Sequence, residues 1–254
     1  MFTNAIVRTP GRSIVEGLSD SKTLGLPNYE QAIIQHQSYI DALTKCGLDV
    51  FVLESCEEYP DSTFVEDVAL ITPNCAIITR PGAPSRRGEV NEMEYILKQK
   101  FNNIEAIVAP GTIEGGDIMM VGDHYYIGLS ERTNLEGAKQ IIQILNKYRM
   151  SASTISLKKV LHLKTGLSYI EKNNLVVCGE FINDSLFEQF NAIEIPKKES
   201  YAANCIWVNE SVIIPLGYPT TKQRIENAGY PVIETDVSEF EKLDGGLSCL
   251  SLRY

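Results

Sequence analysis

One order of expected elements recurs five times along this chain, and it restricts the fold more than any other feature. Each copy consists of a strand, a polar loop, a helix, a short break at Gly or Asn, and a second strand. In the first copy, apolar residues recur at helical spacing over 29–45, and an apolar run at 49–53 follows Gly47. The other copies span 76–108, 124–157, 175–195 and 212–233. Repeats of this kind are typical of propellers and solenoids.

One more strand is expected between successive copies, and each carries a polar marker residue. The markers lie about 45 residues apart, a spacing in the range of repeat architectures; they are Asp67, Glu114, His162, Asn204 and Cys249. The last of these strands ends the chain, and its natural hairpin partner is the first strand, so the copies can close into a ring. We therefore predict an α/β fold, a five-bladed propeller of pseudo-fivefold ββαβ modules with the helices outside. We expect one domain spanning 1–254.

Composition excludes several classes of partner. The 254 residues carry a net charge of -10, which disfavours nucleic acid as a partner because nucleic-acid binding requires a basic face. The same charge is compatible with steering a cationic substrate. No apolar run approaches the roughly 18 residues that span a bilayer, so no membrane partner is expected. The N-terminal residues do not resemble a secretory signal, and the six cysteines form no Cys-x-x-Cys pair. Reduced thiols and a cytoplasmic location are expected.

Cys249 is a candidate nucleophile near the end of the chain. It follows two glycines, Gly245 and Gly246, which permit a sharp turn or a close approach of the backbone to a ligand. The alternative is a buried cysteine that acts as a small apolar residue. If the five connecting strands begin at one mouth of the ring, Cys249 meets His162 and Glu114 there. A thiol, an imidazole and a carboxylate are the groups of an activated cysteine.

Only one of the three histidines is a strong candidate for chemistry. His36 lies mid-helix between two glutamines and is expected to be solvated, and His124 is expected at a turn between two strands. His162 stands among apolar neighbours, where a histidine is often a satisfied core residue. The repeat places it beside the other markers, which favours a catalytic role.

Charged residues near the expected mouth suggest the nature of the ligand. Asp67, Glu66 and Asp61 would surround a positive group. Arg86 and Arg132 occupy matching positions, each in a loop after a strand and before a helix. Guanidinium groups bind carboxylates with two parallel hydrogen bonds, so a ligand with a cation at one end and a carboxylate at the other is expected. The alternative for each arginine is a surface position at a helix start.

These residues resemble the motifs of a known family over the whole chain. The resemblance is to the guanidino-group-modifying superfamily (amidinotransferases, or penteins), and within it to the dimethylarginine dimethylaminohydrolases. It rests on five stretches: 60–67 (PDSTFVED), 80–89 (RPGAPSRRGE), 114–117 (EGGD), 161–166 (LHLKTG) and 244–249 (DGGLSC). It implies hydrolysis of Nω-methylated arginine to citrulline and a methylamine through a covalent S-alkylthiouronium, with no cofactor and no catalytic metal.

The resemblance also implies a role for each candidate residue. Cys249 is the nucleophile, His162 the general acid and base, and Glu114 the partner of the imidazole. The substrate ligands are the guanidinium-binding Asp61, Glu66 and Asp67, the carboxylate-binding Arg86 and Arg132, and the backbone carbonyls of Leu18 and Leu243 at the α-ammonium. The first long loop acts as a lid, and dimers of relatives imply a homodimer.

Related activities remain as alternatives. Arginine and agmatine deiminases carry an aspartate two residues after the histidine, where this chain has Lys164. Losing a carboxylate there suits a methylated nitrogen, which has fewer N–H donors and needs more room. Agmatine has no carboxylate, so both arginines would lack a partner. A non-enzymatic, ribosome-binding pentein is a further alternative, but it leaves the cysteine, histidine and glutamate without a joint purpose.

Overall fold

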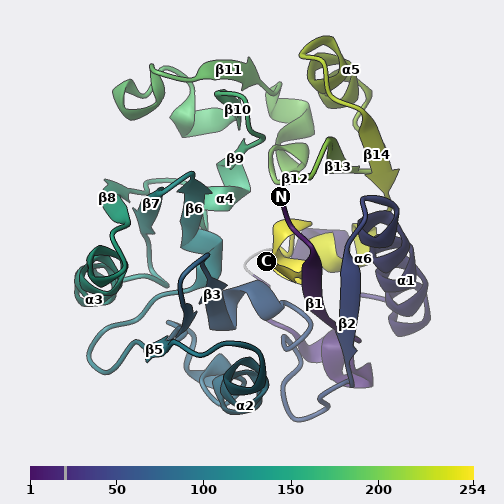
Figure 1. Ribbon diagram of the computed structural model, residues 1–254. Helices are drawn as coiled ribbons and strands as arrows, with labels where there is room; N and C mark the ends of the chain where they lie inside the picture. Colours follow the sequence, from purple (N-terminus) through teal and green to yellow (C-terminus); the bar gives the residue numbers. More distant parts are fainter. Residues whose placement is uncertain (20–21) are drawn as a thin grey trace.

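Five three-stranded sheets surround a central axis in the computed structural model, which describes residues 1–19 and 22–254 (Figure 1). In each sheet the inner strand pairs antiparallel with the middle strand, and the middle strand pairs parallel with the outer one. The predicted propeller of five ββαβ modules is confirmed. In order from inner to outer, the sheets are β15(Leu252–Arg253)-β1(Asn4–Arg8)-β2(Asp49–Leu53), β3(Ala69–Ile71)-β4(Ala76–Ile78)-β5(Ile104–Ala106), β6(Ile118–Val121)-β7(His124–Leu129)-β8(Ser151–Ser156), β9(Leu167–Tyr169)-β10(Asn174–Val177)-β11(Asn191–Glu194) and β12(Ile206–Val208)-β13(Ser211–Pro215)-β14(Val232–Thr235).

Helices join the middle and outer strands in four of the modules and lie at the periphery of the ring (Figure 1). They are α1(Tyr29–Lys45), α2(Val90–Lys100), α3(Leu135–Lys147) and α5(Pro219–Asn227). Asn28 and Asn134 cap α1 and α3 by accepting a hydrogen bond from the backbone N–H three residues later. In the fourth module, the copy at 175–195, the expected helix is only a 3-10 turn at Ser185–Phe187. A short helix α6(Ser238–Glu241) precedes the C-terminal segment.

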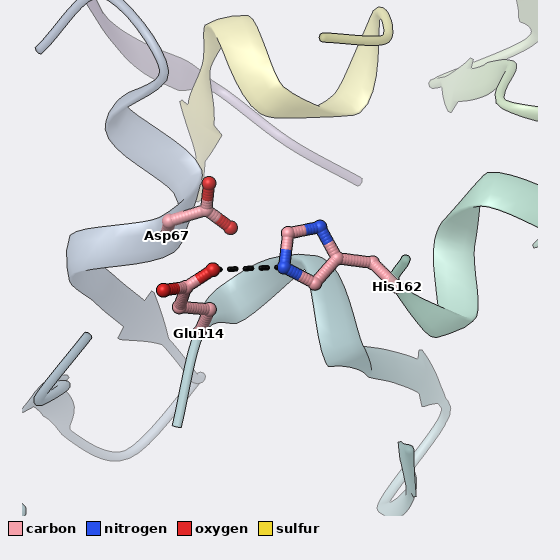
Figure 2. A group of neighbouring side chains, drawn as sticks. All are labelled: Asp67, Glu114 and His162. Carbon is pink, nitrogen blue, oxygen red and sulfur yellow. Dashed lines mark hydrogen bonds and ion pairs between the residues drawn. The ribbon is translucent and has the colours of Figure 1, made fainter. Parts of the chain in front are cut away.

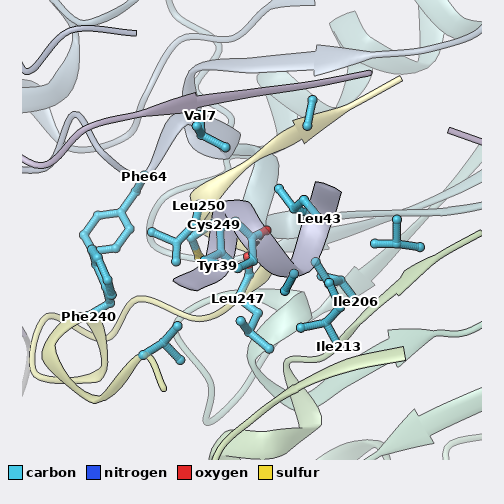
Figure 3. Packing of buried hydrophobic residues seen from close by; sticks show 14 of the residues in the cluster. Val7, Tyr39, Leu43, Phe64, Ile206, Ile213, Phe240, Leu247, Cys249 and Leu250 are labelled. Carbon is cyan, nitrogen blue, oxygen red and sulfur yellow. Dashed lines mark hydrogen bonds between the residues drawn. The ribbon is translucent and has the colours of Figure 1, made fainter. Parts of the chain in front are cut away.

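The two ends of the chain close the ring. β1 pairs antiparallel with β15, with Ala5 opposite Arg253 and Ile6 opposite Leu252. Helix α1 fixes the same region from outside, because the buried Tyr39 hydroxyl donates to the Leu247 carbonyl at 3.0 Å. Figure 3 shows Leu247, Cys249 and Leu250 packed with side chains from α1 and neighbouring strands. The C-terminal segment is therefore part of the hydrophobic core.

The marker residues do not lie on the inner strands as predicted. Each lies in or next to a short helical turn just before such a strand; these turns are η3(Val65–Val68), η5(Gly115–Asp117), α4(Leu163–Gly166), η8(Lys197–Ala203) and η9(Ser248–Leu250). Four of these turns have only three or four residues, and the seven residues of η8 are interrupted by a kink at Glu199, so none is long enough to show helical periodicity. The alternating pattern around His162 therefore resembled a strand, although His162 is the N-cap of α4.

The prediction that His36 is solvated was wrong. Its side chain is 3% exposed and its ring lies 6.4 Å from that of Phe240. The reason is its spacing, because His36 falls on the buried face of α1 with Ala32, Tyr39 and Leu43. Asp20 and Ser21, which belong to the expected lid, lie outside the described residues. Within the described part of the chain, none of the helices combines the length and the apolar character needed to cross a bilayer.

Candidate active site

The turns before the inner strands open onto a small cavity that is lined mostly by polar and charged side chains. It collects every predicted site residue except Glu66. The lining residues are Leu18, Ser19, Asp61, Phe64, Asp67, Arg86, Glu114, Arg132, Leu161, His162, Leu243, Asp244, Gly245 and Cys249. Residues separated by more than 200 positions in the sequence thus meet at one end of the propeller axis.

His162 is held in a fixed orientation by Glu114. The imidazole Nε2 lies 2.8 Å from Glu114 Oε2 (Figure 2), and the glutamate is 1% exposed. Burial alone would lower the pKa of His162, but the hydrogen bond to Glu114 and the charges of Asp67 and Asp117 outweigh it and raise the pKa to about 9. The imidazole is therefore protonated at neutral pH, and Nδ1 remains to exchange a proton with a ligand.

Gly116 and Asp117 also help to position His162. A Cβ at Gly116 would stand only 2.8 Å from His162 Nδ1, so a side chain there would displace the imidazole. Asp117 Oδ1 accepts a hydrogen bond from Leu163 N at 3.0 Å, which anchors the first turn of α4 behind His162. Asp117 was missed as a site residue, although it lies in the Glu-Gly-Gly-Asp stretch quoted above.

Cys249 is buried within the tight turn η9. Its Sγ accepts a hydrogen bond from Gly246 N at 3.4 Å, and only 7% of the residue is exposed. Burial and the nearby charges of Asp67 and Glu66 raise the pKa of the thiol to about 12. The site therefore holds a neutral thiol together with a protonated imidazole, and a cation placed beside the sulfur would favour the thiolate.

Asp67 and Arg86 form a buried ion pair in the wall of the cavity. Arg86 Nη1 lies 2.6 Å from Asp67 Oδ2, and Asp67 Oδ1 accepts a hydrogen bond from Gly116 N. Burial raises the pKa of Asp67, but Arg86 and His162 outweigh this effect and hold it below its ordinary value. The other Arg86 donors bind the Glu89 carboxylate and the Phe64 and Asp61 carbonyls. To bind a substrate carboxylate, Arg86 would use its remaining Nη1 donor or exchange a partner.

Arg132 is much less committed to protein partners. Among the described residues, its guanidinium has one recorded ion pair, at 3.9 Å to Glu114 Oε1, and 19% of its side chain is exposed. Asp61 links the cavity to the first loop, because its Oδ1 accepts from Leu18 N at 2.9 Å. Burial raises the pKa of Asp61 above its ordinary value, although Arg86 opposes this. Leu18 and Leu243 lie at the rim and wall of the same cavity.

Glu66 faces the opposite side of the layer of turns. It accepts a hydrogen bond from Ser248 Oγ at 2.7 Å and forms an ion pair with Lys164. With these partners it lines a second cavity that is surrounded by the inner strands. Consecutive residues of one turn thus point to different cavities, with Asp67 toward the first and Glu66 toward the second.

Three side chains in the first cavity have ligand atoms close enough to share a metal ion. One atom each of Asp67, Glu114 and His162 lies within 4.8 Å of the others (Figure 2). Oxygen and imidazole ligands suit several divalent metals. However, Asp67 already neutralises the buried Arg86, whose positive charge opposes a cation at this position. The hydrogen bonds of the three residues are therefore better explained by a protonated imidazole.

Comparisons with known proteins agree with this geometry. The family model described as N,N dimethylarginine dimethylhydrolase, eukaryotic, matches residues 23–251. The N(G),N(G)-dimethylarginine dimethylaminohydrolase of Pseudomonas aeruginosa is 57% identical over 255 residues, with 100% of both chains covered. A Cys249→Ser variant of DDAH from Pseudomonas aeruginosa, complexed with citrulline, matches with a TM-score of 0.99 over 100% of both chains at 57% identity. A His162→Gly variant of a dimethylarginine dimethylaminohydrolase, solved as its adduct with S-methyl-L-thiocitrulline, matches with a TM-score of 0.98 over 100% of both chains, also at 57% identity.

Proposed function

Since the chain belongs to the dimethylarginine dimethylaminohydrolase family, we propose that it hydrolyses Nω-methylated arginine to citrulline and dimethylamine or methylamine. One observation carries the proposal most directly. A buried cysteine shares a small acidic cavity with a histidine that is hydrogen-bonded to a buried glutamate. The two positions substituted in the related ligand-bound structures have the residue types and numbers of Cys249 and His162 here.

The cavity suits a substrate with a guanidinium at one end. Asp67 supplies a carboxylate beside Cys249 and His162, and Asp61 supplies a second one toward the rim. Arg132 is the main ligand for the α-carboxylate, because few of its donors are already used. We assign Arg86 chiefly to holding Asp67 ionised, with one donor left for the substrate. Carbonyls of Leu18 and Leu243 are assigned to the α-ammonium.

The proton positions define an order of steps. At neutral pH His162 carries a proton, so it is an acid before it is a base. The cationic substrate lowers the pKa of the Cys249 thiol, which loses its proton to solvent, and the thiolate then attacks the guanidinium carbon. His162 donates its proton to the methylated nitrogen of the tetrahedral adduct. The C–N bond breaks, dimethylamine leaves, and the S-alkylthiouronium remains on Cys249.

Hydrolysis of this intermediate restores the enzyme. The neutral His162 takes a proton from water, and the hydroxide attacks the thiouronium carbon. The C–S bond then breaks, the hydroxyl proton of the adduct passes to the leaving sulfur, and neutral citrulline is released, while the proton on His162 remains for the next turnover. Glu114 keeps the imidazole in one orientation through both steps.

The selectivity for a methylated nitrogen is assigned to a missing carboxylate. Lys164 stands where the deiminases carry an aspartate, and it turns away from the cavity to pair with Glu66. The space near the leaving nitrogen therefore has no second carboxylate from this position. Glu66 itself acts on the substrate only at a distance, through its charge.

Three properties of the whole molecule are also proposed. We expect a single domain spanning 1–254 and a cytoplasmic location, which is consistent with six free thiols. We also expect a homodimer, by the family resemblance. Light scattering of the purified protein measures the last of these, and a monomer at all concentrations would contradict it.

The covalent step can be tested directly by mass spectrometry. Acid quenching during turnover of asymmetric dimethylarginine should give a protein whose mass has increased by that of the substrate minus dimethylamine. After proteolysis the increase should lie on the peptide that contains Cys249. A His162→Gly variant should form this adduct more slowly from asymmetric dimethylarginine, because it lacks the acid that protonates the leaving nitrogen. Turnover with a modified cysteine other than Cys249 would overturn the assignment.

A further inference from the structure

Asn204 has no role in the steps above, although it is the marker residue of the last repeat before Cys249. It follows η8 directly, just before the inner strand β12, and is 7% exposed. Its position in the module corresponds to those of Asp67, Glu114 and His162, which all line the cavity. Asn204 does not line it, so its contribution must act through other residues.

The Asn204 side chain joins two of the turns that carry catalytic groups. Its Oδ1 accepts from Ser248 N at 2.9 Å, and its Nδ2 donates to Ser248 Oγ at 3.1 Å. The same Nδ2 donates to the backbone carbonyl of Lys164 at 3.0 Å. Ser248 immediately precedes Cys249, and Lys164 lies within α4, whose N-cap is His162. One amide therefore bridges the turn of the nucleophile and the helix of the acid and base.

The contact with the cysteine turn is also close in space. A Cβ added at Gly246 would stand 2.4 Å from Asn204 Cγ, so the amide packs directly against the Gly246 backbone. The N–H of Gly246 is the donor to Cys249 Sγ. Asn204 thus supports both ends of the short turn that presents the sulfur.

We propose that Asn204 is a positioning residue that fixes the turn of Cys249 against the helix capped by His162. This rests on the proposed function, because the distance between the two turns matters only if both groups act on one substrate. A neutral amide suits the position, since it donates and accepts hydrogen bonds within one group. An aspartate would lose the donor to Lys164 O and would add a negative charge near a thiol that already faces Asp67 and Glu66.

Kinetics of Asn204→Ala test the proposal. A misplacement on the order of 1 Å can lower turnover roughly 100-fold, so we expect kcat for asymmetric dimethylarginine to fall by about 10- to 100-fold. The KM should stay within about threefold, because the ligands of the substrate are untouched. Asn204→Asp should give a similar loss, and it keeps the size of the side chain if the alanine variant folds poorly.

Asn209→Ala is the matched control for lost hydrogen bonds. Its side chain accepts from Phe2 N and donates to Phe2 O and Cys46 O, so it makes as many bonds as Asn204, but none of them to a turn that carries a catalytic group. Because Asn209 has a φ of 57°, alanine there is also strained. The Tm of the control should therefore fall at least as far as that of Asn204→Ala, while its kcat stays within about twofold of the wild-type value.

The pH dependence of Cys249 alkylation by iodoacetamide, followed at this site by mass spectrometry, gives a readout that needs no substrate. A loosened turn admits water to the sulfur, so the midpoint should move to lower pH in Asn204→Ala and stay unchanged in Asn209→Ala. The proposal is overturned if Asn204→Ala has a kcat within threefold of the wild-type value and an unchanged pH midpoint of alkylation. It is also overturned if Asn209→Ala loses as much kcat as Asn204→Ala. A wild-type protein inert toward methylated arginine would contradict the proposed function alone.

Discussion

Glu114 sets the charge of His162, and replacing it with glutamine tests this coupling quantitatively. The substitution keeps the shape of the side chain but removes its negative charge. In the wild type the pKa of His162 is raised from 6.5 to about 9. That difference corresponds to about 3 kcal/mol in favour of the imidazolium, and the hydrogen bond to Glu114 is its largest favourable source. In Glu114→Gln the pKa should fall toward 6.5.

The sign of the effect on stability follows from linkage. A histidine with a raised pKa in the folded state contributes stability that is fully present below pH 6.5 and is lost as the pH rises through about 9. The free energy of unfolding of Glu114→Gln should therefore fall short of the wild-type value by up to about 3 kcal/mol at pH 6, and the gap should narrow by pH 10.

Nuclear magnetic resonance is the direct assay, because the chain has only three histidines. The His162 ring resonance should titrate near pH 9 in the wild type and at lower pH in the variant. His36, whose pKa burial lowers to about 4, is an internal reference that should not move. Turnover should fall on the order of 100-fold. An unchanged His162 midpoint, or a stability gap independent of pH, would refute the reasoning.

Three further perturbations have distinct expected outcomes. Asp67→Asn should raise KM for methylated arginine at least about tenfold, as expected for a lost charged hydrogen bond, and should lower the pH midpoint of Cys249 alkylation; an unchanged KM would remove Asp67 from the substrate site. Lys164→Met leaves the buried Glu66 unpaired and should lower the free energy of unfolding by about 3 kcal/mol, measured in urea, with recovery when Glu66→Gln is added; no loss would mean that the ion pair is unimportant. His36 is neutral in the fold, so its contribution to the free energy of unfolding is present above pH 6.5 and is lost as the pH falls toward 4. Between pH 7.5 and 4.5 the free energy of unfolding of His36→Leu should therefore fall by roughly 2 kcal/mol less than that of the wild type. An equal fall in both proteins would contradict the burial of His36.

The fold was predictable because the repeat contains helices and strands that are long enough to be recognised from the sequence. The helix expected over 29–45 and the strand expected over 49–53 have those bounds in the structure. Each spans enough residues for apolar spacing to identify it. The turns before the inner strands are too short for such a signal, so their residues were placed on strands.

The site was predictable as a group of residues but not in the direction of each side chain. Glu66 and Asp67 are adjacent, and sequence alone cannot say which of two neighbouring carboxylates faces the ligand. The answer depends on Lys164, which pairs with Glu66 from 98 residues away. The sequence identifies Asn204 only as a repeat position, because its bonds to Ser248 and Lys164 exist only once the ring has closed. The burial of His36 did have a local signal in its spacing to Ala32 and Tyr39.

Release of the ureido product from asymmetric dimethylarginine, arginine and agmatine, measured in parallel with Cys249→Ser as the control, tests the central claim most directly. The account predicts citrulline from the methylated substrate, little product from the other two, and no turnover by the variant. Product mainly from arginine or agmatine would contradict the assigned substrate. Full activity of Cys249→Ser, or a folded wild-type protein inactive on all three, would contradict the claim itself.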